Sequence, residues 1–263
     1  MPEFKQNFPP EPVPENPRKI TREEVEARLA RGENLEKLDM KDLDLAGLDF
    51  EGESFRGSDI RGACFYGEKQ GENGKTIEVP ANLRRADFTD AVIGDYGPET
   101  IFGRVEAEEA TFGFTEDLTS RRNRHAKLKG SGERPEATDS GEYYNFNGGG
   151  GNFRKTRWNN IDFGGGPDCD GCEALFPGAD LSEAEIIGCD LAGIDLSTTK
   201  IDGIKIKDPI SLQGLIITEQ QADTLAKAIE LSDEKKRQKF AEEIKQKGPK
   251  KALEDYFRVN IPK

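Results

Sequence analysis

Apolar residues recur at every fifth position along two stretches of this chain. The first stretch holds Leu35, Met40, Leu45, Phe50, Phe55, Ile60 and Phe65. The second holds Phe176, Leu181, Ile186, Leu191, Leu196, Ile201 and Ile206. A period of five fits neither the turn of an α-helix nor the alternation of a flat strand. Repetition at a fixed period indicates a solenoid, in which successive coils stack on one another.

The period of five also constrains the shape of each coil. A chain that turns a corner every five residues directs one large side chain inward per face, so four faces make a square coil of about twenty residues. The residue two places earlier points inward near a corner and is expected to be small. In the second stretch these positions hold Ala174, Ala179, Ala184, Cys189, Ile194, Thr199 and Ile204.

Several units of this pattern resemble the pentapeptide repeat, in which Ala is followed by Asp or Asn, then Leu or Phe, then two variable residues. They include Ala-Asp-Phe-Thr-Asp at 86–90, Ala-Asp-Leu-Ser-Glu at 179–183 and Cys-Asp-Leu-Ala-Gly at 189–193. The resemblance covers most of 33–206 and implies a mainly β fold, a right-handed quadrilateral β-helix. About twenty-four units can be counted, which predicts roughly six coils.

One departure from the repeat concerns the first coil. Leu38, Leu43 and Leu48 occupy positions where the family has a small residue. We therefore expect the first coil to be wider than the others or distorted.

Residues before the first coil predict an arm and a cap. Residues 1–19 contain six prolines and are expected to be a disordered arm. Residues 20–32 predict an N-terminal capping helix, with Thr21 and Glu24 forming a capping box. Such caps are expected because an open coil end exposes unpaired strand edges.

The β-helix itself is expected over 33–217. Insertions interrupt it at 68–78, 113–143 and 164–172. Residues 218–263 predict a C-terminal helical cap, in which Thr218 and Gln221 form a second capping box and Ser232 caps the next helix.

The charge of the chain is unevenly distributed. The formal net charge is −13, and residues 219–263 carry 11 basic and 9 acidic side chains. The remaining 27 basic and 42 acidic side chains leave residues 1–218 with a balance of −15. This argues against binding nucleic acid phosphates over most of the coil and permits binding to a basic protein surface.

Targeting signals are not evident in the sequence. It contains neither an apolar run long enough for a transmembrane helix nor the pattern of a secretory signal peptide. Four cysteines in a chain of this length do not suggest a disulfide framework. We therefore expect a cytoplasmic location, with a specialised secretion route left open.

Motifs that could carry catalysis or metal binding are weak. Gly74-Lys75-Thr76 resembles the end of a phosphate-binding loop, but Lys69 stands where that loop needs glycine. Cys169 and Cys172 form one C-x-x-C pair, whereas a structural zinc site needs four ligands and His125 is the only histidine. The sequence therefore predicts no enzymatic activity, no cofactor and no metal site.

The insertion 113–143 is the strongest candidate for recognition. It carries a basic cluster on an acidic coil, formed by Arg121, Arg122, Arg124, Lys127 and Lys129. Long excursions from a rigid scaffold often bind partners. The sequence therefore predicts a non-catalytic scaffold that binds a protein partner through acidic faces and inserted loops. A solvated loop docked on the acidic coil is the plain alternative.

The family resemblance implies two further functions. Some pentapeptide-repeat proteins resemble B-form DNA in width and charge and bind DNA gyrase or topoisomerase. Others are effectors delivered into host cells. Any surplus apolar face on the C-terminal helices would form a dimer interface.

Overall fold

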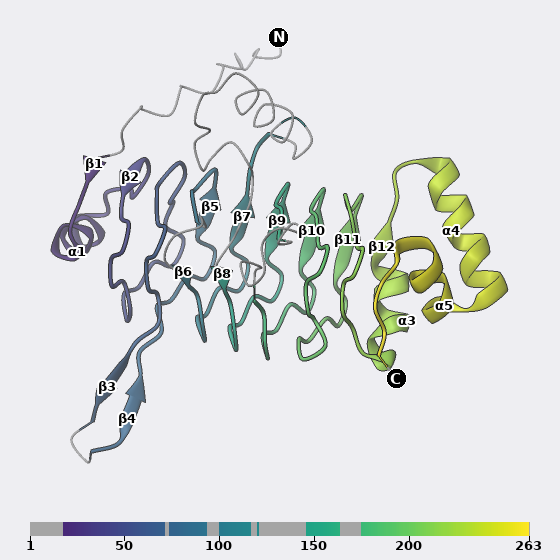
Figure 1. Ribbon diagram of the computed structural model, residues 1–263. Helices are drawn as coiled ribbons and strands as arrows, with labels where there is room; N and C mark the ends of the chain where they lie inside the picture. Colours follow the sequence, from purple (N-terminus) through teal and green to yellow (C-terminus); the bar gives the residue numbers. More distant parts are fainter. Residues whose placement is uncertain are drawn as a thin grey trace, which may run out of the picture.

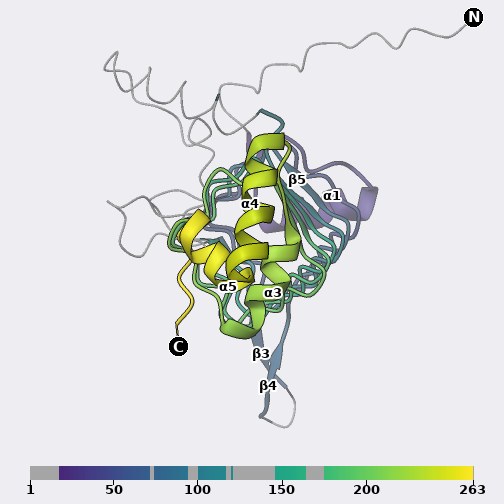
Figure 2. The same ribbon diagram turned by 90° about the vertical axis from the view of Figure 1, so that its right-hand side faces the viewer.

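The computed structural model describes residues 18–71, 74–93, 100–116, 120, 146–163 and 175–262. Within these residues the chain winds into a rod of stacked turns with helices at both ends (Figure 1). Viewed toward the C-terminal end, the helices lie across the stacked turns (Figure 2). The predicted quadrilateral β-helix is confirmed.

Parallel ladders connect the turns. The longest is a six-stranded sheet on one face, with β5 at one edge and β12 at the other. Its strands are β5 (Asp87–Thr89), β7 (Thr111–Gly113), β9 (Arg157–Asn159), β10 (Glu185–Ile187), β11 (Lys205–Lys207) and β12 (Ile229–Glu230). Two shorter parallel pairs join β1 (Arg18–Lys19) to β2 (Leu38–Asp39) and β6 (Thr100–Ile101) to β8 (Phe146–Asn147).

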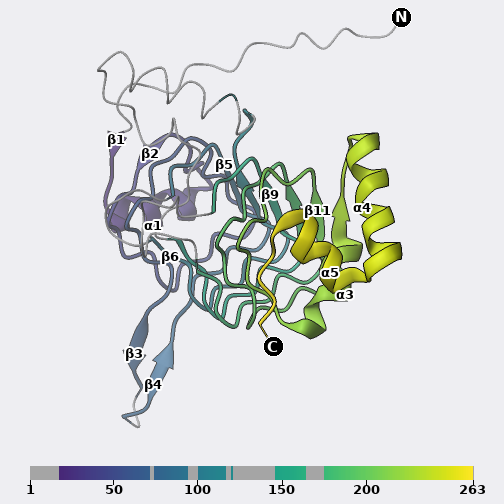
Figure 3. The same cartoon turned by 45° about the vertical axis from the view of Figure 1, so that its right-hand side comes forward.

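Bridges between turns follow the predicted spacing. Asp39 pairs with Asp59, and Asp180 pairs with Lys200, each twenty positions on. The spacing lengthens between Asp49 and Asn82 because the 68–78 insertion lies between them. That insertion is an antiparallel hairpin of β3 (Glu68–Gln70) and β4 (Thr76–Glu78) that projects away from the rod (Figure 3).

The rod has about seven turns rather than six. The count of repeat units stopped at Ile206, where the strict pattern ends, whereas the coil continues toward residue 217. Leu212 and Ile217 are buried at inward positions of the additional turn.

Aromatic rings form columns inside the coil. Along the six-stranded face, Phe55, Phe88, Phe112 and Trp158 stack with successive centroid distances of 4.6, 4.9 and 4.3 Å. Offset-stacked and edge-to-face aromatic pairs add about 0.5–1.5 kcal/mol each beyond the burial of their area. The narrow interior is therefore filled by rings that touch both within a turn and between turns.

One turn of the column on the opposite face of the coil reverses the expected positions. Phe102 donates its backbone N–H to the carbonyl of Asn147 at 2.7 Å, which places Gly148 at the centre position. Phe146 occupies the position that normally holds a small residue, and its ring lies 4.9 Å from Phe102 and 5.4 Å from Phe176. Phe146 thus fills the space that the missing side chain of Gly148 leaves.

A polar residue before many of the inward side chains shapes the corner. Its side-chain oxygen accepts a hydrogen bond from the backbone N–H two residues later. Asp190 does so with Ala192 at 3.0 Å and Asp195 with Ser197 at 2.8 Å. This contact is an Asx-turn, for which Asp and Asn are the preferred residues. Many carboxylates of the acidic coil therefore have a structural role.

The N-terminal cap is helix α1 (Arg22–Arg31), which ends at Gly32. Thr21 caps it by accepting a hydrogen bond from the Glu24 N–H at 3.3 Å. The structure gives Glu24 a different role from that in the predicted capping box, because its carboxylate pairs with Arg18 at 2.9 Å. Arg22 donates to the carbonyls of Asp44 and Ala46 in the first turn.

The first turn accommodates its leucines unequally. Leu38 is buried, whereas Leu43 and Leu48 are only partly buried and pack against the core. Their larger side chains are thus tolerated because they remain partly outside the crowded interior.

The C-terminal cap contains α3 (Glu219–Ala228), α4 (Glu234–Lys247), α5 (Pro249–Ala252) and a π-helical turn (Leu253–Phe257). Thr218 and Gln221 form the predicted capping box. Gln221 also donates to the carbonyls of Leu196 and Thr199, each at 2.8 Å, which satisfies acceptors at the coil end. None of the described helices is long and apolar enough to span a membrane.

The predicted cap of α4 was misplaced by one residue. Asp233 is the N-cap and accepts a hydrogen bond from the Lys236 N–H at 3.0 Å. Ser232 instead bonds to Asp208 of the last turn, with its N–H 2.6 Å from the carboxylate. The tertiary contact with the coil thus takes Ser232 away from the helix.

Candidate interaction surfaces

One corner of the coil carries charges that change sign from turn to turn. We call it the charged corner, and its members are Glu51, Arg84, Arg85, Glu108, Glu109, Arg154, Lys155 and Glu183. Backbone hydrogen bonds stack these turns directly, from Arg85 to Glu108 at 2.9 Å and from Glu109 to Arg154 at 3.0 Å. Acidic and basic turns therefore alternate along this part of the rod.

Ion pairs join successive turns of the charged corner. Glu108 lies 3.2 Å from Arg84 on one side and 3.2 Å from Lys155 on the other. Arg154 reaches Glu183 at 2.6 Å, and Arg85 contacts Glu51. The hydrogen bond from Lys155, assisted by the positive charge of Arg84, lowers the pKa of Glu108. The acidic excess of the chain does not form a continuous stripe along this corner.

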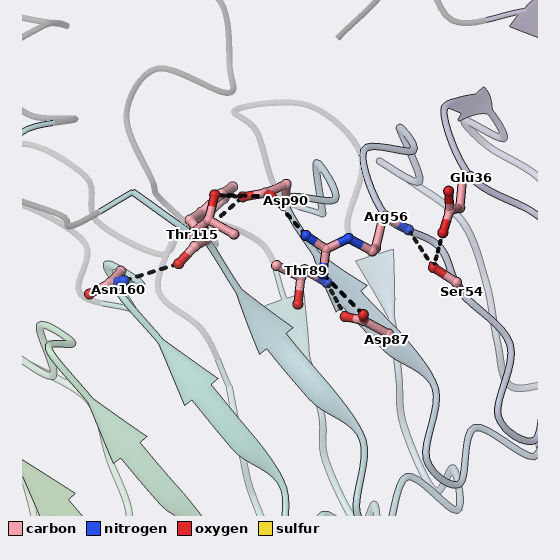
Figure 4. A network of polar contacts seen from close by, with 9 residues as sticks. Glu36, Ser54, Arg56, Asp87, Thr89, Asp90, Thr115 and Asn160 are labelled. Atoms are coloured by element: carbon pink, nitrogen blue, oxygen red, sulfur yellow. Dashed lines mark hydrogen bonds and ion pairs between the residues drawn. The ribbon is translucent and has the colours of Figure 1, made fainter. Parts of the chain in front are cut away.

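A second polar network follows the edge of the six-stranded face (Figure 4). Arg56 lies 3.3 Å from Asp87 and 3.7 Å from Asp90. Asp90 accepts hydrogen bonds from the Thr115 N–H at 2.9 Å and from the Thr115 hydroxyl at 3.1 Å. We call Arg56, Asp87, Asp90, Thr115 and Asn160 the ledge.

The ledge fixes the point where the chain enters the 113–143 insertion. Phe114 is buried, donates its N–H to the carbonyl of Asn159 at 3.0 Å and accepts from the Asn160 amide at 3.0 Å. Gly113 precedes it with a φ of 119°, and an added Cβ there would lie 2.0 Å from the Asn159 carbonyl oxygen. Only glycine allows this close approach of backbones.

The predicted basic cluster belongs to the segment beyond the ledge. Arg121, Arg122, Arg124, Lys127 and Lys129 lie outside the described residues. The same holds for His125, Cys169 and Cys172. Their roles remain predictions.

The hairpin is held to the rod at its base. The Tyr66 hydroxyl donates to Glu68 at 2.9 Å, and Arg104 from the next turn pairs with Glu78. The same guanidinium lies 5.8 Å from the centroid of the Tyr66 ring. Cation–π contacts of this kind contribute about 0.5–1 kcal/mol at exposed sites. The resemblance of Gly74-Lys75-Thr76 to a phosphate loop fails, because Thr76 begins a strand.

The two described cysteines are separate. Cys189 is buried, and burial raises the pKa of its thiol to about 12. That pKa leaves little thiolate to react. In the part of the chain that the structure describes, no group of three or more His, Cys, Asp or Glu side chains could hold a metal ion.

Sequence reasoning missed both the charged corner and the ledge. Each consists of residues from different turns. Insertions of different length separate those turns in the sequence, so the spacing between the residues is irregular. The available signal was in the pairs of charged residues that follow the inward residues of one column, because these pairs alternate between basic and acidic.

Comparisons with known proteins give one family match and several similar solved structures. A family model of pentapeptide repeats matches residues 172–203. No curated protein matches the chain by sequence. The match with the pentapeptide repeat protein Rfr23 of the cyanobacterium Cyanothece 51142 is 13% identical, covers 72% of this chain and 97% of that chain, and has a TM-score of 0.26.

Two other solved structures are similar at the same level. Full-length QnrB1, a plasmid-mediated fluoroquinolone resistance protein, is 15% identical over 80% of this chain and 93% of its own, with a TM-score of 0.25. HetL, involved in heterocyst differentiation regulation in Nostoc sp. strain PCC 7120, is 15% identical over 75% and 97%, with a TM-score of 0.20. Scores this low support no inference about function.

Proposed function

We propose that this chain, in which residues 172–203 match a family model of pentapeptide repeats, acts as a non-catalytic scaffold that binds a protein partner. The recognition element is the 113–143 insertion with its basic cluster, presented by the rod. A rigid platform reduces the conformational freedom that binding must remove.

The observation that carries this proposal is the fixed base of the insertion. The coil keeps its register across the insertion, because Phe112 stacks on Trp158 at 4.3 Å. Thr115 is tied to Asp90, and Phe114 to Asn160, immediately beyond the last strand before the insertion. The insertion thus leaves from a defined point on a continuous rod, as expected for a presented binding segment.

The charge of the insertion indicates the kind of partner. Its five basic side chains would bind an acidic surface. The net negative charge of residues 1–218 would repel such a partner from the rest of the coil and orient it toward the insertion. An acidic protein surface is therefore the expected target.

An affinity pull-down with quantitative mass spectrometry tests the proposal. The bait is the full chain, compared with a variant in which Arg121, Arg122, Arg124, Lys127 and Lys129 are changed to Ala. The matched control changes five exposed lysines of α3 and α4 to Ala, which removes the same positive charge elsewhere: Lys227, Lys235, Lys236, Lys239 and Lys245. The proposal is supported if partners captured by the full chain and by the control are lost from the variant of the basic cluster. Identical partners from all three baits contradict it.

The DNA-mimic alternative has a separate requirement. It needs a continuous acidic stripe that gyrase or topoisomerase could bind in place of DNA. The balance of −15 before residue 219 favours it, whereas the alternating signs of the charged corner favour the scaffold. Salt-sensitive inhibition of gyrase supercoiling by the purified chain would select the mimic. Delivery as an effector stays a prediction from family resemblance.

A further inference from the structure

The hairpin of β3 and β4 exposes an unpaired strand edge and a large hydrophobic side chain. Every residue of β3 and β4 is exposed, and Ile77 is one of the large exposed hydrophobic side chains among the described residues, at 44%. The hairpin points away from the rod, and no further described strand pairs with it (Figure 3). Unpaired edges of this kind are templates for pairing with another strand.

The hydrogen bonds of the hairpin show which backbone groups face outward. Val79 donates to Gly67 at 2.8 Å, and Gly71 donates to Lys75 at 2.8 Å. In an antiparallel ladder, hydrogen-bonded pairs alternate with pairs whose groups point outward. Given the register of Lys69 opposite Ile77, the outward groups of β4 belong to the two residues that flank Ile77. Those residues are Thr76 and Glu78.

The β4 edge is complementary to a second copy of itself. An antiparallel pairing centred on Ile77 places Thr76 of each copy opposite Glu78 of the other and engages all four outward-facing residues. Ile77 then meets Ile77 of the second copy at a non-hydrogen-bonded pair, where side chains approach closely. Pairing about a single residue is isologous and closes as a dimer.

The other edge of the hairpin lacks this property. The equivalent pairing along β3 would set Lys69 opposite Lys69 of the second copy. Like charges directly opposite destabilise a sheet, and lysine is a common protection of free edges. Only β4 therefore presents an edge that fits itself.

We propose that two copies of this chain associate through β4, so that their hairpins form one four-stranded antiparallel sheet centred on Ile77. Lys69 flanks the two Ile77 side chains on the same face of that sheet and shields them with its stem. The strands are short, so the association is weak and depends on concentration. It is independent of the scaffold function proposed above.

Sedimentation velocity of the full chain over a wide concentration range tests this proposal. The wild type is expected to form a dimer as its concentration rises. Thr76→Pro removes an outward N–H without removing a bond inside the hairpin, and we expect it to raise the dimer dissociation constant at least about tenfold. Gln70→Pro is the matched control, because Gln70 lies directly opposite and its N–H faces the other edge.

A charge pair provides the second arm of the test. Ile77→Lys and Ile77→Glu are each expected to be monomeric, since they place like charges opposite one another. A mixture of the two is expected to form the dimer again. A wild type that stays monomeric overturns the proposal. So does a dimer that persists in Ile77→Lys, or one that only Ile244→Lys on α4 disrupts.

Discussion

Phe112 and Trp158 stack face to face, with ring centroids 4.3 Å apart and an angle of 9° between the planes. The entire 113–143 insertion lies between them in sequence, yet they occupy adjacent turns of one column. The indole N–H of Trp158 also donates to the buried Thr156 hydroxyl at 2.6 Å. The column of rings and the β7–β9 ladder therefore continue across the insertion.

Replacing this tryptophan should destabilise the whole rod. Trp158→Ala removes a fully buried ring and is expected to cost about 3–5 kcal/mol of unfolding free energy. Urea unfolding followed by circular dichroism measures the loss, because the chain then contains no tryptophan. Trp158→Phe keeps an aromatic ring in the stack and loses the hydrogen bond and part of the buried ring volume, so it should cost less, about 1–2 kcal/mol. Equal losses in both variants would contradict the importance of the stack.

Gly113 should be irreplaceable for a different reason. A Cβ at this position would lie 2.0 Å from the carbonyl oxygen and 2.7 Å from the nitrogen of Asn159, both of which are backbone atoms. Because neither can move without breaking the β7–β9 ladder, Gly113→Ala should cost at least about 3 kcal/mol.

Gly52 provides the control for Gly113. It also has a positive φ, of 75°, but nothing lies within 4 Å of an added Cβ. Gly52→Ala should therefore cost only the conformational strain, about 1–2 kcal/mol. Chemical unfolding of both variants measures the difference, and a smaller loss in Gly113→Ala than in Gly52→Ala would show that the close contact is not limiting.

The sequence predicts the columns better than it predicts the surfaces. Leu35, Leu181 and Leu191 are buried as their period requires, because every turn imposes the same inward geometry. The register between turns is less accessible, since it depends on how many residues each insertion adds. Arg84 and Glu108 thus meet in space without a regular spacing in sequence.

Local exceptions also escaped the sequence pattern. Phe146 fits the expectation of a buried repeat residue, but its backbone occupies the small position beside Gly148. Similarly, Ser232 has the chemistry of a helix cap, and only its contact with Asp208 shows that it serves the coil instead. Both depend on tertiary neighbours that a single repeat unit does not specify.

The exchange of positions between Phe146 and Gly148 can be tested by compensation. Phe146→Ala should cost about 3–5 kcal/mol by opening a cavity in the aromatic column. Gly148→Phe should also destabilise, because an added Cβ would lie 2.8 Å from the Phe146 ring. The double variant restores the usual order of a small residue followed by a large one. Its unfolding free energy should exceed that of either single variant, whereas additive losses in denaturant unfolding would refute the exchange.

We expect the rod to lose stability at acidic pH, because protonation of Glu108 removes the stabilisation that its carboxylate provides. The Lys155 hydrogen bond lowers the pKa of Glu108 in the folded state below its usual value of 4.5. In the pH range between the two values the unfolded chain binds more protons, so stability rises with pH there. The stabilisation by this carboxylate is complete above 4.5 and is lost as the pH falls through the lowered pKa.

Glu108→Gln should therefore flatten part of the pH dependence. Denaturant unfolding between about pH 3 and pH 6 is expected to show the variant below the wild type at the upper end and close to it at the lower end. Asp202→Asn, at an equivalent corner position of a later turn, controls for the removal of one negative charge. A Glu108→Gln profile parallel to that of the wild type would mean that the carboxylate is not held by Lys155 in the folded protein.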